Sequence, residues 1–264
     1  MRLISWNVNR RTSVLVEQAA ALASREPTVV ALQEVTVRSW PLWQAALTTI
    51  GLPHAVRSDP FRPRRTVVVI AARELEPADA LAVPWPESTV AAAVQGITVH
   101  AAHVPNAANG QVKPDTLAAM RAGLEHGSGP RVVCGDFNTP RREHPDGTVI
   151  SFARDTRERL RAERGEPWDS AELGVVPGLR DLGFADAWRT LHGYGSKDPS
   201  WVFSHGGGWR LDHVFLSAEL EPVAATYHHA WRDSGLSDHS ALEVDLRVRS
   251  GTDGGAGSGN GLRV

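Results

Sequence analysis

Polar side chains end several apolar segments of the chain, where burial alone would favour hydrophobic residues. Asn7 and Glu34 lie near the ends of RLISWNV and TVVALQEV, and Asp136 and Asn138 follow the apolar run RVVC. Carboxylate and amide oxygens are hard ligands that suit Mg²⁺ or Mn²⁺, which bind few protein groups and retain waters. Zinc is not favoured, because the lone Cys134 and the scattered histidines show no ligand spacing. These residues could therefore hold a hard divalent cation.

Histidines and carboxylates recur at similar places further along the chain. Asp212 lies within the otherwise apolar WRLDHVFLS, Asp238 and His239 precede the alternating stretch ALEVDL, and His103 lies near the end of ITVHAAHV. A carboxylate such as Asp212 is costly to bury unless it is paired. An imidazole near a carboxylate can be held in one tautomer and stabilised as the cation. The combination suits a hydrolytic acid–base pair beside the metal site.

Each of these positions also has an ordinary structural explanation. Asn7 could end a strand in a turn, Glu34 could be a solvated edge residue, and Gly-Asp-Phe-Asn could form an Asx-turn. Asp238 and His239 could belong to a solvated turn. Because the polar groups recur at strand ends, however, a common cleft at the ends of packed strands explains them together.

The elements that must position these groups are strands alternating with helices. Apolar runs and alternation predict strands at 2–8, 28–35, 65–73, 131–134, 201–205, 209–217, 222–230 and 240–248, and a hairpin of 88–95 with 97–104 around Gly96. Helical spacing predicts helices at 12–26, behind a Thr/Ser N-cap, at 41–52 and at 116–127, and 150–190 is expected to be mostly helical. The pattern favours one domain over 1–249, in which mixed sheets pack together under helices.

Composition narrows the classes of function. The chain has 264 residues, of which 42% are hydrophobic, and its formal net charge is −2. It can bury a large core, but it has no general basic field for nucleic acid, so such contacts must be local. The single Cys134 fits a reducing compartment, and no signal sequence or membrane span is indicated, so we expect a cytoplasmic protein. Residues 250–264 are rich in Gly and Ser and should be a disordered tail.

Five short motifs in order along residues 1–248 resemble those of the endonuclease/exonuclease/phosphatase superfamily, which contains exonuclease III, the apurinic endonucleases and deoxyribonuclease I. They are SWNVN (5–9), LQEV (32–35), GDFN (135–138), RLDHVF (210–215) and SDH (237–239). The resemblance implies an α+β fold, a four-layer αββα sandwich of two packed mixed β-sheets flanked by helices. It also implies a metal-dependent phosphoesterase with its site where the loops of the two sheets meet.

The resemblance also implies a metal site. Glu34 would be the main ligand of Mg²⁺ or Mn²⁺, Asn7 would assist at the metal, and Asp238 would support the metal or its waters. These roles agree with the hard oxygen donors that the motifs carry.

The resemblance further implies how the remaining motif residues would act. Asp136 would orient and deprotonate the attacking water, and Asn138 would position the phosphate. His239 would bind or protonate the phosphate oxygens and would be held by Asp212. A phosphodiester anion repels a nucleophile, so charge neutralisation and a positioned water are what its hydrolysis requires.

His103 departs from the exonuclease III pattern, in which tyrosine usually stands in a segment resembling His103-Val104-Pro105-Asn106. We interpret His103 as a phosphate contact or as the general acid for the leaving group, and Asn106 as a substrate-binding residue. The structural alternative is a buried histidine bonded to the backbone. Two further departures, the absence of a lysine shortly after Glu34 and an arginine rather than a glycine at position 10, question abasic-site specificity more than phosphodiester hydrolysis.

Local groups could recognise the substrate. Arg10 and Arg141 lie in predicted loops, where they could contact phosphates, and Trp209 could stack on a base or an abasic sugar. Surface solubility and core packing are the structural alternatives.

The function predicted first is a metal-dependent DNA nuclease of the exonuclease III or apurinic endonuclease type, acting in DNA repair or degradation. A phosphatase or phosphodiesterase for a small-molecule, lipid or RNA phosphate ester is the alternative. A catalytically silent binding module is disfavoured, because each acid of the motifs and the final histidine are intact. DNA or another phosphodiester is thus the expected partner, and no feature indicates a membrane or an obligate protein partner.

Overall fold

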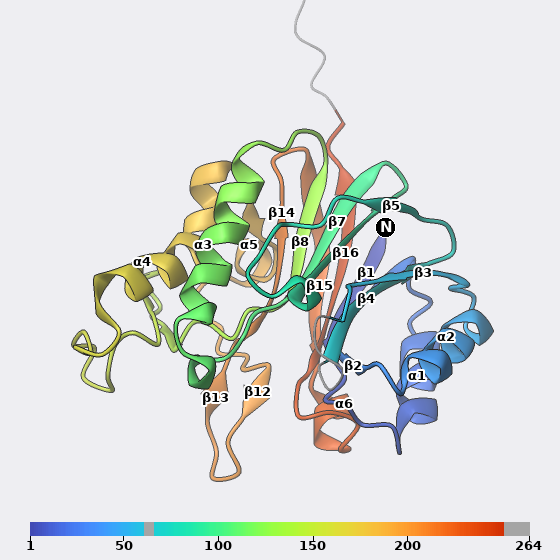
Figure 1. Cartoon of the computed structure of the whole chain (residues 1–264), viewed down its shortest axis with the longest axis horizontal. Helices are drawn as coiled ribbons and strands as arrows, with labels where there is room; N and C mark the ends of the chain where they lie inside the picture. Colours follow the sequence, from blue (N-terminus) through green and yellow to red (C-terminus); the bar gives the residue numbers. More distant parts are fainter. Residues whose placement is uncertain (61–65, 251–264) are drawn as a thin grey trace, which may run out of the picture.

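Two six-stranded sheets pack face to face, and helices cover their outer faces (Figure 1). The computed structural model describes residues 1–60 and 66–250. The strand order is β15-β16-β1-β2-β4-β3 in the first sheet and β11-β14-β8-β7-β6-β5 in the second. The predicted four-layer αββα sandwich with two mixed sheets is therefore confirmed.

The strands of each sheet come from several parts of the chain. The first sheet contains β1 (Arg2–Asn7), β2 (Val29–Thr36), β3 (His54–Arg57), β4 (Thr66–Ala72), β15 (Leu220–His228) and β16 (Ala241–Val248). The second contains β5 (Glu76–Ala78), β6 (Thr89–Val94), β7 (Ile97–His103), β8 (Arg131–Asp136), β11 (Ala185–Asp186) and β14 (Asp212–Leu216). Two small ribbons pair β9 (Arg142–Glu143) with β10 (Val149–Ile150) and β12 (Trp201–Val202) with β13 (Gly208–Trp209).

Helices form the two outer layers. Figure 1 shows α1 and α2 beside the first sheet and α3 and α4 beside the second. The helices are α1 (Leu15–Ala23), α2 (Trp40–Thr49), α3 (Val112–Glu125), α4 (Gly165–Val175), α5 (Ala187–His192) and α6 (His229–Asp233), and the 3₁₀ turns are η1 (Pro86–Ser88), η2 (Ala107–Asn109) and η3 (Gly178–Leu182). Three buried apolar clusters separate the four layers, the largest of them between the two sheets.

The side-chain alternation of the strands explains why polar residues gather at one end of the inter-sheet core. In β8, Val132 and Cys134 belong to this core, whereas Val133 packs under the helices. Successive side chains of a strand point to opposite faces, so Asp136 continues the inward row. The same period places Asn7 of β1 and His103 of β7 in the inward rows of their strands. Where the apolar rows stop, polar groups therefore face each other across the gap between the sheets.

Each sheet has one parallel pair of strands near its centre, β1 with β2 and β7 with β8. The carboxyl ends of these four strands lie at one edge of the sandwich, next to the amino ends of β14 and β16, which run antiparallel to β8 and β1. Gly135 permits close contact within the second pair, because a Cβ at this position would stand 1.9 Å from the carbonyl oxygen of Ala102. The topology thus brings the motif residues of distant segments to one place.

Several elements differ from the sequence-based predictions. α1 begins at Leu15 with Val14 at its N-cap and makes no side-chain cap bond, so the predicted Thr/Ser cap is wrong. Most of 150–164 is loop rather than helix, and α4 begins at Gly165. The predicted strand 209–217 is split into β13 and β14, which places Asp212 at the start of a strand rather than inside one.

Two further predictions concern the C-terminal tail and membrane-spanning helices. The tail at 250–264 lies outside the described residues apart from Ser250. Within residues 1–60 and 66–250, none of the helices has the length and apolar character needed to cross a membrane.

Candidate active site

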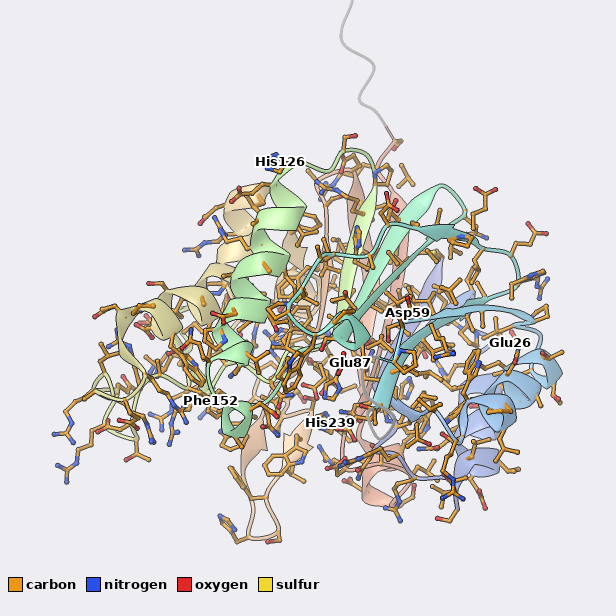
Figure 2. The ribbon with its side chains drawn as sticks, viewed as in Figure 1. Glu26, Asp59, Glu87, His126, Phe152 and His239 are labelled. Carbon is orange, nitrogen blue, oxygen red and sulfur yellow. The ribbon has the colours of Figure 1, made fainter. Side chains whose placement is uncertain are left out.

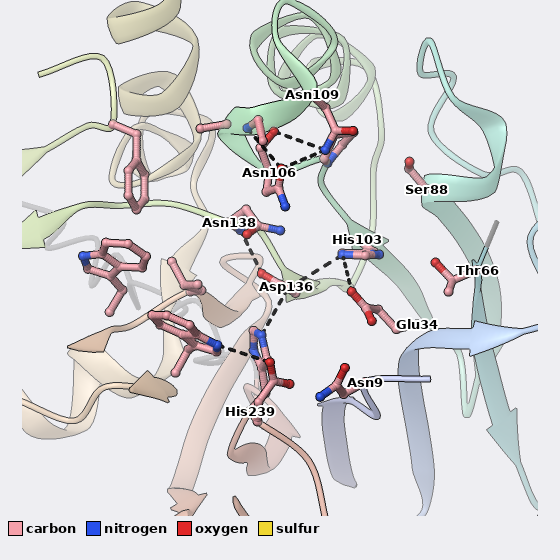
Figure 3. Close-up of a pocket in the computed structure, with 18 of the residues that line it drawn as sticks. Asn9, Glu34, Thr66, Ser88, His103, Asn106, Asn109, Asp136, Asn138 and His239 are labelled. Carbon is pink, nitrogen blue, oxygen red and sulfur yellow. Dashed lines mark hydrogen bonds and ion pairs between the residues drawn. The ribbon is translucent and has the colours of Figure 1, made fainter. Parts of the chain in front are cut away.

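The ends of the parallel strand pairs open into a cleft of about 680 Å³ (Figure 3). Most of the residues predicted from the sequence to form a site line this cleft: Arg10, Glu34, His103, Asn106, Asp136, Asn138, Arg141, Trp209, Asp238 and His239. The remaining two, Asn7 and Asp212, lie directly behind it and contact Asp136 and His239. The structure therefore brings together every residue of the predicted set.

His239 and Asp212 form a buried hydrogen-bonded pair. Nδ1 of His239 lies 2.8 Å from Oδ2 of Asp212, and the side chain of Asp212 is fully buried. The Tyr227 hydroxyl donates to the Asp212 carbonyl oxygen at 2.6 Å, which fixes the start of β14. Burial alone would lower the pKa of His239, but the carboxylates of Asp212 and Asp136 outweigh it and raise the pKa to about 10. The ring is therefore oriented by Asp212 and carries a positive charge at neutral pH.

Asp136 stands opposite the other nitrogen of this imidazole. Nε2 of His239 lies 3.8 Å from Oδ2 of Asp136. Asn7 donates to the same oxygen at 3.0 Å, and the backbone N–H of Asn138 donates to Oδ1 at 2.9 Å. The bond from Asn138 forms an Asx-turn. Gly-Asp-Phe-Asn therefore forms the turn expected from its ordinary structural explanation and also lines the cleft. Burial raises the pKa of Asp136, although the charge of His239 opposes this shift.

Glu34 reaches the cleft through a break in the strand pattern. Simple alternation would place Glu34 with Leu32, on the helix-covered face of the first sheet. The pairing of β2 with β4 is irregular between Leu32 and Val35, and Glu34 has a left-handed φ of 59°. Such a backbone conformation is costly for a residue other than glycine and is typical of functional positions. The bulge turns the Glu34 carboxylate toward His103 and Asp136.

His103 lies between the carboxylates of the two sheets. Its Nε2 is 3.7 Å from Oε1 of Glu34 and 3.8 Å from Oδ2 of Asp136 (Figure 3). Both distances are longer than those of hydrogen bonds. The ring is half-buried and lines the cleft, so the sequence-based alternative of a buried histidine bonded to the backbone does not describe it.

The remaining predicted residues lie around this centre. Asn138 has a left-handed φ of 52° and donates its side-chain amide to the Val104 carbonyl at 2.8 Å. Asn106 caps η2 by accepting from the Ala108 N–H at 3.1 Å. Asp238 is exposed and accepts from the indole N–H of Trp201 at 3.3 Å. The side chains that bound the cleft are thus themselves held by hydrogen bonds.

Two groups of residues could hold a cation. Asp136, Asp212 and His239 have ligand atoms within 4.8 Å of one another. An ion there would compete with the His239–Asp212 hydrogen bond and with the positive charge that these acids favour on the imidazole. At Glu34 the competitor is different: Oε2 is buried without a hydrogen bond, but the Arg10 guanidinium lies 2.9 Å away as an ion pair that a cation would have to displace. The Arg10 side chain is 62% exposed and can move aside at less cost than the buried His239–Asp212 pair can be broken, so the Glu34 carboxylate fits a hard cation better.

A buried pair that the sequence analysis missed supports the cleft from behind. The Lys113 ammonium and the Glu172 carboxylate lie 2.7 Å apart and are almost completely buried. Lys113 also donates to the Asn138 carbonyl at 2.8 Å, and Glu172 accepts from the Thr139 hydroxyl and the Phe152 N–H. The pair therefore ties the Asp136–Asn138 loop to α3, α4 and the wall of the cleft. The one signal for this pair in the sequence was that Lys113 is one of only two lysines in the chain.

Comparison with known proteins gives one family and a consistent fold. The model of the Endonuclease/Exonuclease/phosphatase family matches residues 4–239. An AP endonuclease from Archaeoglobus fulgidus superposes with a TM-score of 0.73 and 22% identity, covering 94% of this chain and 100% of that one. The 3′ phosphatase NExo from Neisseria, solved with a product DNA hairpin, gives 0.70 and 22%, covering 94% and 99%. No curated protein sequence matches the chain. At these identities the two structures support the fold alone.

Proposed function

Because the chain belongs to the endonuclease/exonuclease/phosphatase family, whose members hydrolyse phosphate esters, we propose that it is a divalent-metal-dependent DNA nuclease of the exonuclease III or apurinic endonuclease type. One observation carries this proposal most directly. A carboxylate with a raised pKa, Asp136, lies 3.8 Å from an imidazole that Asp212 holds in place. The arrangement places a base that could deprotonate water, Asp136, beside a cation that could bind the phosphoryl oxygens, His239.

Asp136 is the proposed base. Burial raises its pKa and so strengthens it as a proton acceptor near neutral pH. Asn7 and the N–H of Asn138 fix its two oxygens, so the attacking water would meet a carboxylate of one orientation. Positioning of this kind accounts for much of the rate of phosphoryl transfer.

His239 is the proposed contact to the phosphoryl oxygens. Its Nδ1 is bonded to Asp212, which leaves Nε2 directed to the cleft centre near Asp136. A preorganised cation at this position stabilises negative charge that develops on the phosphoryl group. We assign the leaving-group side to His103, which could donate a proton or contact the phosphate.

Glu34 would be the main ligand of Mg²⁺ or Mn²⁺, with Asn7 and Asp238 as supporting groups. Asn7 Oδ1 already accepts from the Asn9 N–H at 2.9 Å, but a carbonyl oxygen has a second lone pair. When bound, the metal would supply Lewis-acid charge to the phosphate. Arg10, Asn106, Asn138, Trp209 and Arg141, which line the same cleft, would hold the substrate.

The names of the structural neighbours support DNA as the substrate. One is described as an AP endonuclease and the other as a 3′ phosphatase bound to a product DNA hairpin. The cleft is consistent with this, since arginines suit phosphates and indole rings suit bases. A role in DNA repair or degradation would follow. The second description also keeps a phosphatase as the alternative, acting on a DNA end or on a small, lipid or RNA phosphate.

A substrate panel tests the proposal. The purified protein is incubated with Mg²⁺ or Mn²⁺ and separately with plasmid, an abasic duplex, a 3′-recessed duplex, a duplex with a 3′ phosphate, RNA and bis(p-nitrophenyl) phosphate. We expect metal-dependent cleavage of at least one DNA substrate and its abolition by EDTA. The Asp136→Asn protein is the matched control for a contaminating nuclease.

The outcomes separate the candidates. Turnover of the small diester without cleavage of any nucleic acid would favour the phosphodiesterase alternative. Release of only the 3′ phosphate would favour the phosphatase. Hydrolysis of none of these esters, or full activity in Asp136→Asn, would contradict the proposed function.

A further inference from the structure

One wall of the cleft carries three arginines, and only Arg141 among them has a proposed role, in holding the substrate. Arg141, Arg161 and Arg164 all line the cleft, and all come from the segment between the GDFN motif and α4. The carboxylates of the cleft, including Glu34, Asp136 and Asp238, lie on other segments. The cleft therefore has an acidic centre and a separate basic wall.

The guanidinium groups of Arg161 and Arg164 contact mainly neutral groups rather than carboxylates. Arg164 donates to the Phe152 carbonyl and lies over the Trp168 ring at 4.8 Å. Arg161 donates to the Arg154 carbonyl at 3.4 Å, and its ion pair with Glu163, at 3.6 Å, is on an acid whose side chain is 67% exposed. Carbonyl groups and an aromatic ring orient a guanidinium without neutralising its charge.

Arg141 lies beside these two cations without a partner of its own. In the described part of the chain, its guanidinium makes no hydrogen bond and no ion pair, and only its backbone N–H is bonded, to the Ile150 carbonyl. Partial burial and the charges of Arg161, Arg142 and Arg164 lower the pKa of Arg141, although the Asp155 carboxylate opposes this shift. Like charges that are held together in a cleft, with Arg161 paired only to the largely exposed Glu163, favour the binding of an anion.

An aromatic pair lines the cleft next to the arginines, because Arg164 donates to the Phe152 carbonyl. The rings of Phe152 and Trp209 meet edge to face with their centroids 4.9 Å apart, and both line the cleft. Figure 2 shows Phe152 on the α4 side of His239, and Figure 3 shows aromatic side chains gathered on one side of the cleft and Asp136, His103 and Glu34 on the other. Since Arg164 is bonded to Phe152, the arginines belong to the α4 side of the cleft, and an anion bound there would contact a different side of the cleft from one bound by His239.

We propose that Arg141, Arg161 and Arg164 bind a second phosphate of the substrate, so that the enzyme acts on a polynucleotide chain and engages two phosphates of it at once. Guanidinium groups suit this ligand because their planar donors bind phosphate oxygens in pairs. The rings of Phe152 and Trp209 would contact the nucleoside between the two phosphates. This inference rests on the proposed function and specifies its substrate class.

The test compares substrates that have one phosphate with substrates that have several. Arg141→Gln is the informative variant, because Arg141 makes no side-chain bond on which the fold depends. Arg157→Gln is the matched control, since it removes the same charge from the same segment at an exposed position outside the cleft. KM is measured for a single-stranded oligonucleotide and for bis(p-nitrophenyl) phosphate.

We expect Arg141→Gln to raise the oligonucleotide KM about ten-fold more than the small-diester KM, in line with the loss of one charged phosphate contact. The slope of log(1/KM) against log salt should also become shallower by about 0.7 for a single strand. Arg157→Gln should change neither quantity.

The result that overturns the inference is an equal change, or no change, in the two KM values. A wild-type protein that hydrolyses only small esters would overturn it too. A wild-type protein that hydrolyses no phosphate ester at all would instead contradict the proposed function itself, so the two failures are distinguishable.

Discussion

Two neighbouring residues of β14 belong to two buried clusters of charge that differ in how completely they are paired. Asp212 faces the cleft, whereas His213 faces the opposite side of the second sheet, since successive side chains of a strand point in opposite directions. His213 contacts Asp186 at 3.1 Å. We call its surroundings the paired cluster, which consists of Glu143, Asp186, Arg189, Arg210 and His213.

The carboxylates of the paired cluster have a donor on every oxygen. Arg210 and Arg189 each lie 2.7 Å from an oxygen of Glu143, and Arg210 lies 2.9 Å from Asp186. Burial alone would raise the pKa of Glu143, but the charge and hydrogen bonds of Arg210 and those of Arg189 outweigh it and lower the pKa to about 2. The carboxylates of Glu143 and Asp186 therefore stay charged, and their oxygens are all engaged in contacts that stabilise the fold.

The acids of the cleft are less completely paired, although each oxygen of Asp136 accepts one hydrogen bond. Burial raises the pKa of Asp136, and Oδ1 of Asp212 is buried without any hydrogen-bond donor. A buried carboxylate oxygen that accepts no hydrogen bond costs stability. Proteins retain such an oxygen mainly where a ligand or a reaction uses it. The comparison indicates that the same residue types stabilise the fold in one cluster and are available for chemistry in the other.

The largest expected effect is that of Asp136→Asn. Loss of a positioned base should lower kcat/KM for the phosphodiester by about 10⁴-fold. The free energy of unfolding should fall by only about 1–2 kcal/mol, because Asn keeps the acceptor for Asn138 and removes a charge whose burial is unfavourable, although its amide nitrogen cannot accept from Asn7. Steady-state kinetics and urea denaturation of the same preparation measure both quantities. A large loss of stability with retained activity would break the comparison.

Glu143→Gln should show the reverse. Breaking a buried ion pair should lower the free energy of unfolding by about 3 kcal/mol at pH 7, while kcat/KM stays within about two-fold of the wild type. Glu158→Gln is the control, since the Glu158–Arg142 pair is half-exposed and should contribute little.

The ion pairs of Glu143 with Arg210 and Arg189 also predict how stability depends on pH. The folded pKa of Glu143, about 2, is below its ordinary value of 4.5, so the stabilisation is complete above pH 4.5. It is lost as the pH falls toward 2. The wild-type unfolding free energy should therefore decline more steeply than that of Glu143→Gln over this window, and parallel curves would contradict the assignment.

Asp212→Asn should have an intermediate effect on the reaction. Asp212 orients His239 rather than touching the substrate, so kcat should fall by about 10²-fold while KM changes little. Asp233→Asn, at an exposed position, is the control. A change confined to KM would indicate that Asp212 affects substrate binding rather than the orientation of the imidazole.

Glu34→Gln should give the smallest effect that still depends on the metal. Removing one charge from the proposed ligand set should raise the Mg²⁺ concentration needed for half-maximal activity by about ten-fold, and saturating Mg²⁺ should restore part of kcat. Titration calorimetry of Mg²⁺ with the protein checks the same change without turnover. An unchanged metal requirement would place the cation elsewhere, with the Asp136, Asp212 and His239 group as the next candidate.

The strand and helix patterns could predict mixed sheets packed under helices, and the polar residues at strand ends could predict a common cleft, whereas the four-layer order was implied by the resemblance of the five motifs to a known family. Asn7, His103 and Asp136 continue inward rows that the apolar residues define. Glu34 is different, since alternation alone would direct it outward and the bulge that corrects this depends on the pairing with β4. Its place in the site could be inferred only from its motif.

Other parts of the site depend on contacts between segments far apart in the chain. Lys113 and Glu172 meet because α3 packs against α4, a contact that no local pattern encodes. Arg161 and Arg164 were assigned to a helix, but a loop directs them to the cleft. Helical periodicity cannot show where a loop will lie.

The central claim is that the two sheets contribute to one reaction centre, and a double-mutant cycle tests it most directly. Glu34→Gln alters the first sheet, Asp136→Asn alters the second, and kcat/KM for a phosphodiester is measured for both single variants and for the double variant. Residues that act as a unit give non-additive losses. We expect the double variant to be no less active than Asp136→Asn alone. Losses that multiply would show that Glu34 and Asp136 act independently, and would contradict a single centre.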